Sequence, residues 1–220
     1  MKTIAIIPAR GESKRLPNKN QLLLGGIPLV AHSILYALAN SQYIDAVFVS
    51  TDSAAIKKIA LDFGAQVIDR PSELSGDFEP TVSAVKHALQ QLECKIENVI
   101  LLQPTNPIRP ANLLQDCLQN FHQKKCDSLF TVSQNHQKLG RISNSVFEPF
   151  NYEFGQRSQD LEPLFCENGL LYIAKAALVQ NNIIISENAF PYIMNSDVPI
   201  VDIDTQADLD YAEYLYKTIK

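Results

Sequence analysis

Apolar and polar residues alternate in blocks along the chain, and the blocks predict a regular succession of strands and helices. Short, nearly continuous apolar runs indicate buried strands at 3–8, 45–51, 65–68, 98–103 and 127–133. The segments between them carry apolar residues at helical spacing, at 28–40, 53–64, 80–93 and about 110–123. Buried strands separated by amphipathic helices are typical of a parallel sheet covered on both faces, so we expect an α/β fold.

Two residues mark helix ends within this pattern. Gly64 closes the segment 53–64 and is placed where a helix often passes into the left-handed backbone conformation that glycine adopts easily. Pro80 opens the segment 80–93, and proline is well tolerated in the first turn of a helix. Both signals support the assignment of these two segments as helices.

The alternation stops between about 135 and 165. This stretch is polar, has no helical period and is too long for an ordinary connection. Its aromatic residues favour an ordered, β-rich arm over a disordered linker. An apolar run at 168–174 resumes the sheet, and the segment from 199 predicts a last strand and a terminal helix. We therefore expect one domain over 1–220 with an arm inserted at about 135–165.

Composition narrows the classes of partner. The formal net charge of −5 disfavours a surface that coats nucleic acid. The four cysteines are widely spaced and form no C-x-x-C motif, which disfavours a structural zinc site and suits a reducing compartment. No apolar run approaches the length of a membrane span, and the N-terminal apolar run is short for a signal peptide. We expect a cytoplasmic protein with neither nucleic acid nor membrane as a partner.

A cluster of positive charge follows the first predicted strand. The stretch "IIPARGESKRLPNKN" (6–20) contains Arg10, Lys14, Arg15 and Lys19 on an otherwise acidic chain. Ligands of parallel sheets bind at the carboxyl ends of the strands, which is where this stretch lies. It matches neither the P-loop nor the dinucleotide-binding glycine pattern. Two interpretations stay open: a loop that holds a triphosphate with side-chain cations, or a solvated turn.

A second candidate site lies near the C-terminus. Asp202 and Asp204 are two residues apart in "IVDIDT", so on an extended chain they share one face, with Val201 and Ile203 on the other. Two carboxylates at a sheet edge suit a hard cation with oxygen ligands. Alternatively, Asp204 or Thr205 caps the helix that follows.

Several motifs together resemble one family. "IIPARGESKRLPNKN" resembles the signature P-A-R-x-x-S-K-x-L-P-x-K-N of the acylneuraminate (CMP-sialic acid) cytidylyltransferases, and "LLQPTNPIR" (101–109) is similar to that family's L-L-Q-P-T-S-P-L-R. "STD" (50–52), "RPSEL" (70–74), "ENGLLYI" (167–173) and "DIDT" (202–205) follow in the family's order, so the resemblance spans essentially the whole chain. It implies a three-layer, Rossmann-like nucleotidyltransferase fold with a mostly parallel sheet and a small dimerisation arm.

The resemblance also implies a reaction. Members transfer CMP from CTP to the anomeric 2-hydroxyl of a nine-carbon 2-keto sugar acid and release pyrophosphate, with Mg²⁺ as the cation and a homodimer as the active form. Such catalysis depends on positioning and on neutralising phosphate charge, so no covalent thiol is needed and Cys166 is expected to serve packing. Two alternatives remain: another sugar nucleotidyltransferase on the same fold, such as one for Kdo, and a catalytically silent nucleotide-binding paralogue.

Residue roles follow from the motifs that match. The resemblance assigns nucleotide binding to Arg10, Lys14, Lys19, Asn20, Arg70 and Thr81, and sugar binding to Gln103, Arg157, Asn168, Gly169 and Tyr172. It assigns the metal to Asp202 and Asp204, and the catalytic roles to Arg10, Lys19 and Asp204. Arg15 is expected to be a solvated charge.

The arm and two departures from the family's sequence pattern bear on which sugar acid the protein would bind. In the family the arm reaches over the partner's active site, and Arg157 matches an arginine that meets the sugar carboxylate from there. Cys166-Glu167 stands where sialic acid members carry Arg-Pro, and Ile184-Ile185 where some carry aromatic residues of the acyl pocket. N-acetylneuraminate, legionaminate and a related 5,7-diacylamino sugar therefore all remain candidates.

Overall fold

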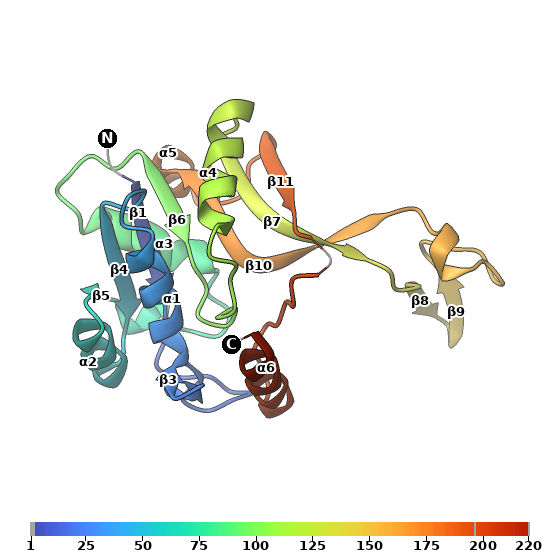
Figure 1. Cartoon of the computed structure of the whole chain (residues 1–220), viewed down its shortest axis with the longest axis horizontal. Helices are drawn as coiled ribbons and strands as arrows, with labels where there is room; N and C mark the ends of the chain where they lie inside the picture. Colours follow the sequence, from blue (N-terminus) through green and yellow to red (C-terminus); the bar gives the residue numbers. More distant parts are fainter. Residues whose placement is uncertain (1–2, 196, 220) are drawn as a thin grey trace.

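The computed structural model describes residues 3–195 and 197–219, which form a layered body and a projecting arm (Figure 1). The central layer is a seven-stranded sheet in the order β11-β7-β10-β6-β1-β4-β5. Strand β10 is antiparallel to both of its neighbours, and the other pairings are parallel. The predicted α/β fold with a mostly parallel sheet is confirmed. Its strands are β1 (Thr3–Pro8), β4 (Ala46–Thr51), β5 (Gln66–Asp69), β6 (Asn98–Leu101), β7 (Ser128–Asn135), β10 (Leu164–Lys175) and β11 (Ala189–Ile193).

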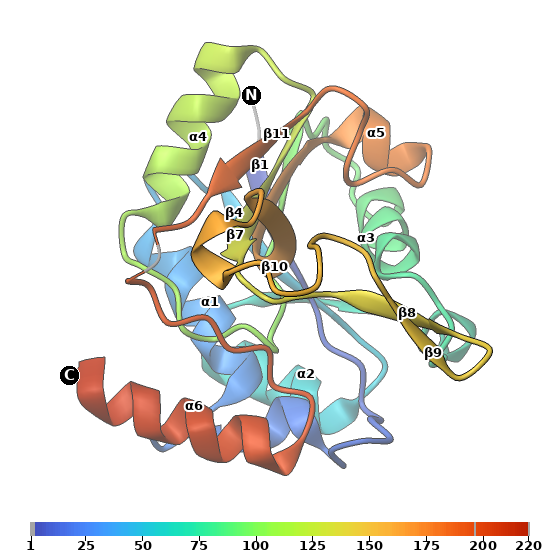
Figure 2. The same cartoon turned by 90° about the vertical axis from the view of Figure 1, so that its right-hand side faces the viewer.

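Helices cover both faces of this sheet (Figure 2). Helices α1 (Leu29–Ala39), α2 (Ala54–Asp62) and α4 (Leu113–Lys124) pack on one face, and α3 (Thr81–Gln90) and α5 (Ala176–Gln180) pack on the other. In β1, Ala5 and Ile7 enter the first core while Ile4 and Ile6 enter the second. Because both faces of β1 are buried, its sequence is almost continuously apolar instead of alternating.

A third apolar cluster joins the two ends of the chain. Helix α6 (Gln206–Ile219) packs Leu209, Ala212 and Leu215 against Leu16 and Leu24. The N-terminal partners belong to the region of the short helix η1 (Lys19–Gln21) and the two-residue strands β2 (Leu23–Leu24) and β3 (Ile27–Pro28). This packing brings the cationic loop beside the segment 201–204, although 180 or more positions separate them in the sequence.

The arm projects from the sheet along the continuation of β7 and β10 (Figure 1). It contains the antiparallel hairpin β8 (Gly140–Ser143) and β9 (Val146–Pro149) and the short helix η3 (Ser158–Asp160). Several of its large apolar side chains are exposed: Leu139, Ile142, Val146, Phe147, Phe150 and Phe154. The arm thus presents an apolar surface outside the three cores.

Some predicted boundaries differ from the structure. The last strand predicted after 199 is wrong: this segment is extended but joins no sheet, because Ile203 N donates to Thr105 O on a loop. Helix α5 and strand β11 were not predicted. Gly64 has a φ of +87° just beyond α2, as its position indicates, and Pro80 is the residue before α3. Over the described residues, no helix has the length and apolar character that crossing a membrane requires.

Candidate active site

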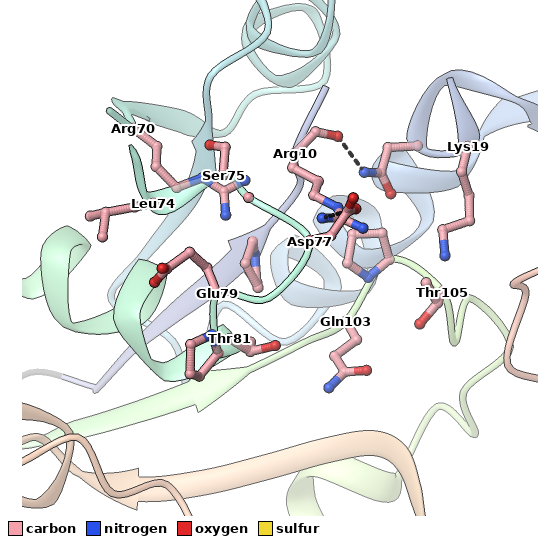
Figure 3. A pocket seen from close by; sticks show the side chains of 15 residues that line it. Arg10, Lys19, Arg70, Leu74, Ser75, Asp77, Glu79, Thr81, Gln103 and Thr105 are labelled. Atoms are coloured by element: carbon pink, nitrogen blue, oxygen red, sulfur yellow. Dashed lines mark hydrogen bonds and ion pairs between the residues drawn. The ribbon is translucent and has the colours of Figure 1, made fainter. Parts of the chain in front are cut away.

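The carboxyl ends of β1, β4, β5 and β6 lie at one edge of the sheet because these strands are parallel. A cavity of about 280 Å³ opens above this edge (Figure 3). Five of the six predicted nucleotide-binding residues line it: Arg10, Lys19, Asn20, Arg70 and Thr81. We call it the cationic cavity. The sixth residue, Lys14, lines two neighbouring hollows that share Arg10 and Asp77 with it.

An acidic residue lies between two of these cations. Asp77 precedes α3, and its Oδ1 lies 2.8 Å from Arg10 Nη1 while its Oδ2 lies 2.5 Å from Lys14 Nζ. The Lys14 and Arg10 charges hold the pKa of the Asp77 carboxyl below its usual value. Figure 3 shows the Arg10 and Asp77 side chains facing each other in the cavity. The sequence motifs gave no indication of this contact, because Asp77 lies outside the motifs used for the resemblance.

Two neighbouring residues, Lys19 and Asn20, fix the part of the cationic cavity next to Arg10. Asn20 is buried and its Nδ2 donates to Arg10 O at 2.9 Å, which holds the backbone of the loop in place. The Lys19 side chain is only 12% exposed, and its Nζ lies 2.7 Å from Asp204 Oδ1. Burial leaves the ammonium with little competing water, which strengthens its interaction with any anion in the cavity.

Arg70 is a buried charge of the site with unused hydrogen-bond donors. It follows β5, is 8% exposed, and its Nε and Nη2 have no hydrogen-bond partner within the described part of the chain. Burial lowers the pKa of Arg70, against a raising effect of the Asp52 charge. Buried donors of this kind are rare without a partner. A guanidinium that lines a cavity with free donors is a ready binding group for phosphate or carbonyl oxygens.

Thr81 and Gln103 complete the cationic cavity. Thr81 is the first residue of α3, whose N-terminus faces the cavity, and the positive end of a helix attracts anions. Gln103 follows β6 and lines this cavity and a second one of about 560 Å³. We call the latter the polar cavity. Its wall contains Gln103, Ser133, Cys166, Glu167, Asn168, Gly169, Tyr172, Ile200 and Asp202.

A bulge in β10 shapes the polar cavity. The register of β10 against β7 shifts between Glu167 and Tyr172. Within the bulge, Asn168 Oδ1 accepts from Thr131 Oγ1 at 2.6 Å and Asn168 Nδ2 donates to Ser133 Oγ at 2.9 Å. Gly169 has a φ of +76°, a conformation that a residue with a Cβ adopts only with strain. The Asn-Gly pair therefore builds the bulge itself as well as lining the cavity.

Glu167 and Tyr172 form a hydrogen bond across the polar cavity. The Tyr172 hydroxyl donates to Glu167 Oε1 at 2.5 Å. Burial raises the pKa of Tyr172, and the hydrogen bond to Glu167 raises it further. The expectation that Cys166 serves packing is wrong, because Cys166 is exposed in this wall. Ile184 packs against the second core, which also contains Tyr172, and is not itself among the residues that line the polar cavity.

The two C-terminal carboxylates lie beside both cavities. Val201 and Ile203 are buried while Asp202 lines the polar cavity, so the predicted alternation holds without a strand. The Arg15 side chain is 69% exposed, as expected of a solvated charge, and its Nη2 also lies 2.7 Å from Asp204 Oδ2, a contact that the sequence did not predict. Desolvation raises the pKa of Asp202, and the neighbouring charge of Asp204 adds to this effect.

The alternative role of Asp204 as a helix cap is not supported. Thr205 Oγ1 accepts from Asp208 N at 3.3 Å, and Asp208 Oδ2 accepts from Thr205 N at 2.7 Å. These two reciprocal bonds form a capping box, in which Thr205 is the cap of α6. Asp204 keeps its carboxylate for other partners. The two carboxylates give oxygen donors of the kind that Mg²⁺ prefers.

The described residues contain no cluster of three or more His, Cys, Asp or Glu side chains suited to a metal. The carboxylate pair therefore fits a cation that completes its coordination with phosphate oxygens and water, as Mg²⁺ commonly does. Arg157 lies apart from both cavities on the arm, where it forms a two-point ion pair with Asp160 at 2.7 and 3.0 Å. Of the predicted sugar-binding residues, the structure brings Gln103, Asn168, Gly169 and Tyr172 together within this chain.

Taken together, a mostly parallel α/β sheet, a cationic cavity at its carboxyl edge and an acid pair beside it define a nucleotide-binding enzyme fold of the nucleotidyltransferase class. The sequence matches the family model described as cytidylyltransferase over residues 4–219. The chain therefore belongs to the cytidylyltransferase family.

Curated relatives support this assignment over the full length. The chain is 35% identical to the CMP-N,N'-diacetyllegionaminic acid synthase of Legionella pneumophila, over 98% of this chain and 96% of that protein. It is 32% identical to the pseudaminic acid cytidylyltransferase of Campylobacter jejuni, over 99% and 97%. It is 31% identical to the N-acylneuraminate cytidylyltransferase of Streptococcus agalactiae, over 94% of this chain and 52% of that protein.

A solved structure shares the fold at lower identity. The CMP:2-keto-3-deoxy-manno-octonic acid synthetase, in complex with CTP, superposes with a TM-score of 0.77, covers 100% of both chains and is 19% identical. At this identity the likeness establishes the fold alone, and the choice of sugar has to come from the site.

Proposed function

We propose that this cytidylyltransferase transfers CMP from CTP to the anomeric 2-hydroxyl of a nine-carbon 2-keto sugar acid and releases pyrophosphate. The observation that carries the proposal is the meeting of the cationic cavity and the polar cavity at Gln103. One cavity suits a triphosphate and the other suits a hydroxyl-rich ligand. The relatives named above act on legionaminic, pseudaminic and acylneuraminic acids, which supports a nine-carbon acid.

The nucleotide side uses fixed positive charge. Arg10 and Lys19 both line the cationic cavity, where they neutralise the charge that builds on the phosphates as pyrophosphate leaves. Lys14 adds a positive charge to the same loop. Asn20 holds the loop backbone through its hydrogen bond to Arg10 O. Arg70 and Thr81 add donors at the far wall. Lys19 also pairs with Asp204, so it connects the phosphates with the acid pair.

The sugar side uses hydrogen bonds. Gln103, Asn168 and Tyr172 line the polar cavity and offer amide and hydroxyl groups to sugar hydroxyls. Gly169 allows close approach of the ligand to the backbone of the bulge. Asp202 lines the same cavity as Gln103, and its carboxylate offers an acceptor for the proton of the attacking 2-hydroxyl.

Asp202 and Asp204 are the residues that would hold Mg²⁺. When bound, the ion would neutralise triphosphate charge and lower the pKa of a coordinated hydroxyl. In this arrangement Asp204 exchanges its contacts with Lys19 and Arg15 for the ion, which frees both cations for the phosphates.

We further propose one domain over 1–220 that acts as a homodimer in the cytoplasm. The exposed apolar side chains of the arm support the dimer, because large apolar groups gathered on a projecting element favour burial against a partner. Arg157 would then meet the sugar carboxylate of the partner's site, to which a planar guanidinium is well matched. The cytoplasm supplies CTP, the proposed substrate, which supports that location.

The test of the proposal is pyrophosphate release from CTP and Mg²⁺ with a panel of sugar acids. The panel holds N-acetylneuraminate, legionaminate, a second 5,7-diacylamino acid and Kdo. Release with a nine-carbon acid but not with Kdo is the expected result. Release with Kdo alone would move the protein to the eight-carbon class, and tight CTP binding without turnover of any sugar would favour a silent paralogue.

A further inference from the structure

Asn106 is completely buried between the two functional segments and belongs to the wall of neither cavity. Its Nδ2 donates to Asn168 O at 3.1 Å and to Val201 O at 3.2 Å. Asn168 belongs to the bulge that lines the polar cavity, and Val201 directly precedes Asp202. A single amide group therefore holds together the backbone of the proposed sugar wall and the backbone of the acid pair.

The other end of the same amide fits closely against the bulge. Asn106 Oδ1 accepts from Thr105 Oγ1 at 3.2 Å. A Cβ on Gly169 would lie 2.6 Å from Asn106 Oδ1, which is closer than such contacts allow. The asparagine thus occupies space that exists only because position 169 is glycine. Its three polar contacts and this close approach leave the amide one orientation.

The nucleotide side of the junction is held by different residues. Arg109 Nη2 donates to Gln103 O at 2.7 Å, and Arg109 Nε donates to Leu170 O at 2.6 Å. Ser33 Oγ donates to the same Gln103 carbonyl at 3.3 Å. Loss of the Asn106 amide leaves these bonds in place. A change at Asn106 is therefore expected to move the sugar wall relative to the acid pair, with the cationic cavity intact.

We propose that Asn106 is a positioning residue that sets the distance between the bulge at Asn168-Gly169 and the segment Val201–Asp204. This inference deepens the proposed function, because it assumes that the polar cavity takes the keto sugar acid. In transfer reactions a small displacement of the acceptor from the reacting phosphate lowers the rate strongly. The side chain acts through the two backbones and touches no substrate itself.

The experiment compares Asn106→Ser with Asn98→Ser. The motif L-L-Q-P-T-S-P-L-R has serine at the position that Asn106 occupies in this chain. The short serine side chain cannot donate to both carbonyls. Asn98 is an equally buried asparagine at the other end of β6, where its Nδ2 donates to Thr3 Oγ1 at 3.2 Å. Both variants lose a buried amide, so both lower the melting temperature. They differ in which backbones they release.

Asn106→Ser is expected to raise the KM of the sugar acid about tenfold and to lower kcat, while the KM of CTP changes less than about twofold. Asn98→Ser is expected to leave all three constants within about twofold. Equal changes in the sugar and CTP constants, or no change in either, would overturn the proposal. Hydrogen exchange gives a second readout without any sugar: faster exchange at both Leu170 and Ile203 amides is expected in Asn106→Ser, and unchanged exchange at both would also overturn it.

This design separates failure of the inference from failure of the proposed function. The kinetic constants are measured with whichever keto sugar acid the unmodified enzyme uses. If that acid is Kdo, the nine-carbon assignment fails while the constants still test Asn106. If no acid is used, the exchange measurement decides the question for Asn106.

Discussion

Arg10 and Asp77 form an ion pair with 2.8 Å between Nη1 and Oδ1 at the mouth of the cationic cavity. The second oxygen of the same carboxylate contacts Lys14. Under the proposed function, the triphosphate of CTP binds the same two cations. Binding is then expected to displace Asp77 from both partners, and its charge to oppose the incoming phosphates.

Asp77→Asn is expected to tighten CTP binding by about threefold to tenfold, because the competing carboxylate is removed while the shape of the side chain is kept. The effect is expected to shrink at high salt, since the pair is partly exposed. Calorimetric titration of CTP at low and high salt measures it. Glu79→Gln is the matched control, because Glu79 lines the same cavity and the change in net charge is identical. Equal tightening by both variants would indicate a general charge effect instead.

Arg70→Met is expected to separate affinity from stability. The guanidinium is buried and two of its nitrogens lack partners among the described residues, so a neutral side chain of similar length is expected to hold or raise the melting temperature. The affinity for CTP is expected to fall about tenfold to a hundredfold, because a charged donor group is lost. CTP titration and thermal unfolding of the same samples measure both quantities. A less stable variant with normal CTP affinity would show that Arg70 is structural.

Regular periodicity made the fold largely predictable from the sequence. The strands predicted at 3–8 and 45–51 and the end of α2 shortly before Gly64 follow from local residue patterns that tertiary packing reinforces. The segment 199–205 was less predictable, because an apolar alternation there serves packing on a loop and on α6 instead of pairing in a sheet. Periodicity reports which face is buried but not what covers it.

The candidate site was predictable where a motif carried it and not where a contact completed it. Arg10, Lys19 and Gln103 lie in motifs that end strands, so parallel pairing brings them to one edge. Asp77 and Asn106 gain their importance from partners that are distant in the sequence. Such partners become visible only when the chain is folded.

His32 is expected to make the stability of the fold sensitive to acid. Its Nε2 donates to Leu24 O at 3.0 Å, and burial lowers its pKa below the ordinary value. Above a pH of about 6.5 the imidazole is neutral in both folded and unfolded states, so its ionisation contributes nothing to the free energy of unfolding. As the pH falls through and below that value, the unfolded state binds the proton first and the fold loses stability.

Thermal unfolding at pH 7.5 and at pH 5.5 measures this effect. The two values lie on either side of the unperturbed histidine pKa of about 6.5. His32→Gln keeps a donor for Leu24 O and is expected to show a smaller drop in melting temperature between the two conditions than the unmodified protein. His122→Gln is the control, because His122 is exposed on α4. If His32→Gln keeps the full drop, another group causes the acid sensitivity.

Asp204→Asn is expected to lower turnover by about a hundredfold or more, as the loss of a charged catalytic group does. CTP binding is expected to survive largely unchanged. The amide is a poor ligand for Mg²⁺, but the proposed nucleotide-binding residues Arg10, Lys14 and Arg70 are unchanged. Arg15→Ala is the comparison, because it removes the ion-pair partner of Asp204 Oδ2 and leaves the carboxylate itself in place. Titration of activity with Mg²⁺ measures both variants. Near-normal activity of Asp204→Asn at ordinary Mg²⁺ would remove the metal assignment.

The arm is expected to hold two chains together. Ile142 and Phe150 are 79% and 61% exposed, so the double change Ile142→Ser, Phe150→Ser removes apolar surface from the arm without opening a core. Sedimentation equilibrium is expected to give a dimer for the unmodified protein and a monomer for this variant. Leu61→Ser on α2, at an equally exposed apolar side chain of 56%, is expected to stay dimeric.

A mixing experiment then tests Arg157 across the dimer. Arg157→Ala and Asp204→Asn are each expected to be nearly inactive alone. In a mixed dimer, the site of the Arg157→Ala chain has an intact Asp204 and receives Arg157 from its partner, so unfolding and refolding the two variants together is expected to restore activity at one site of two. The same mixture is expected to stay inactive if Arg157 serves the site of its own chain. A fully active monomer of the unmodified protein would likewise show that Arg157 has no role across the interface.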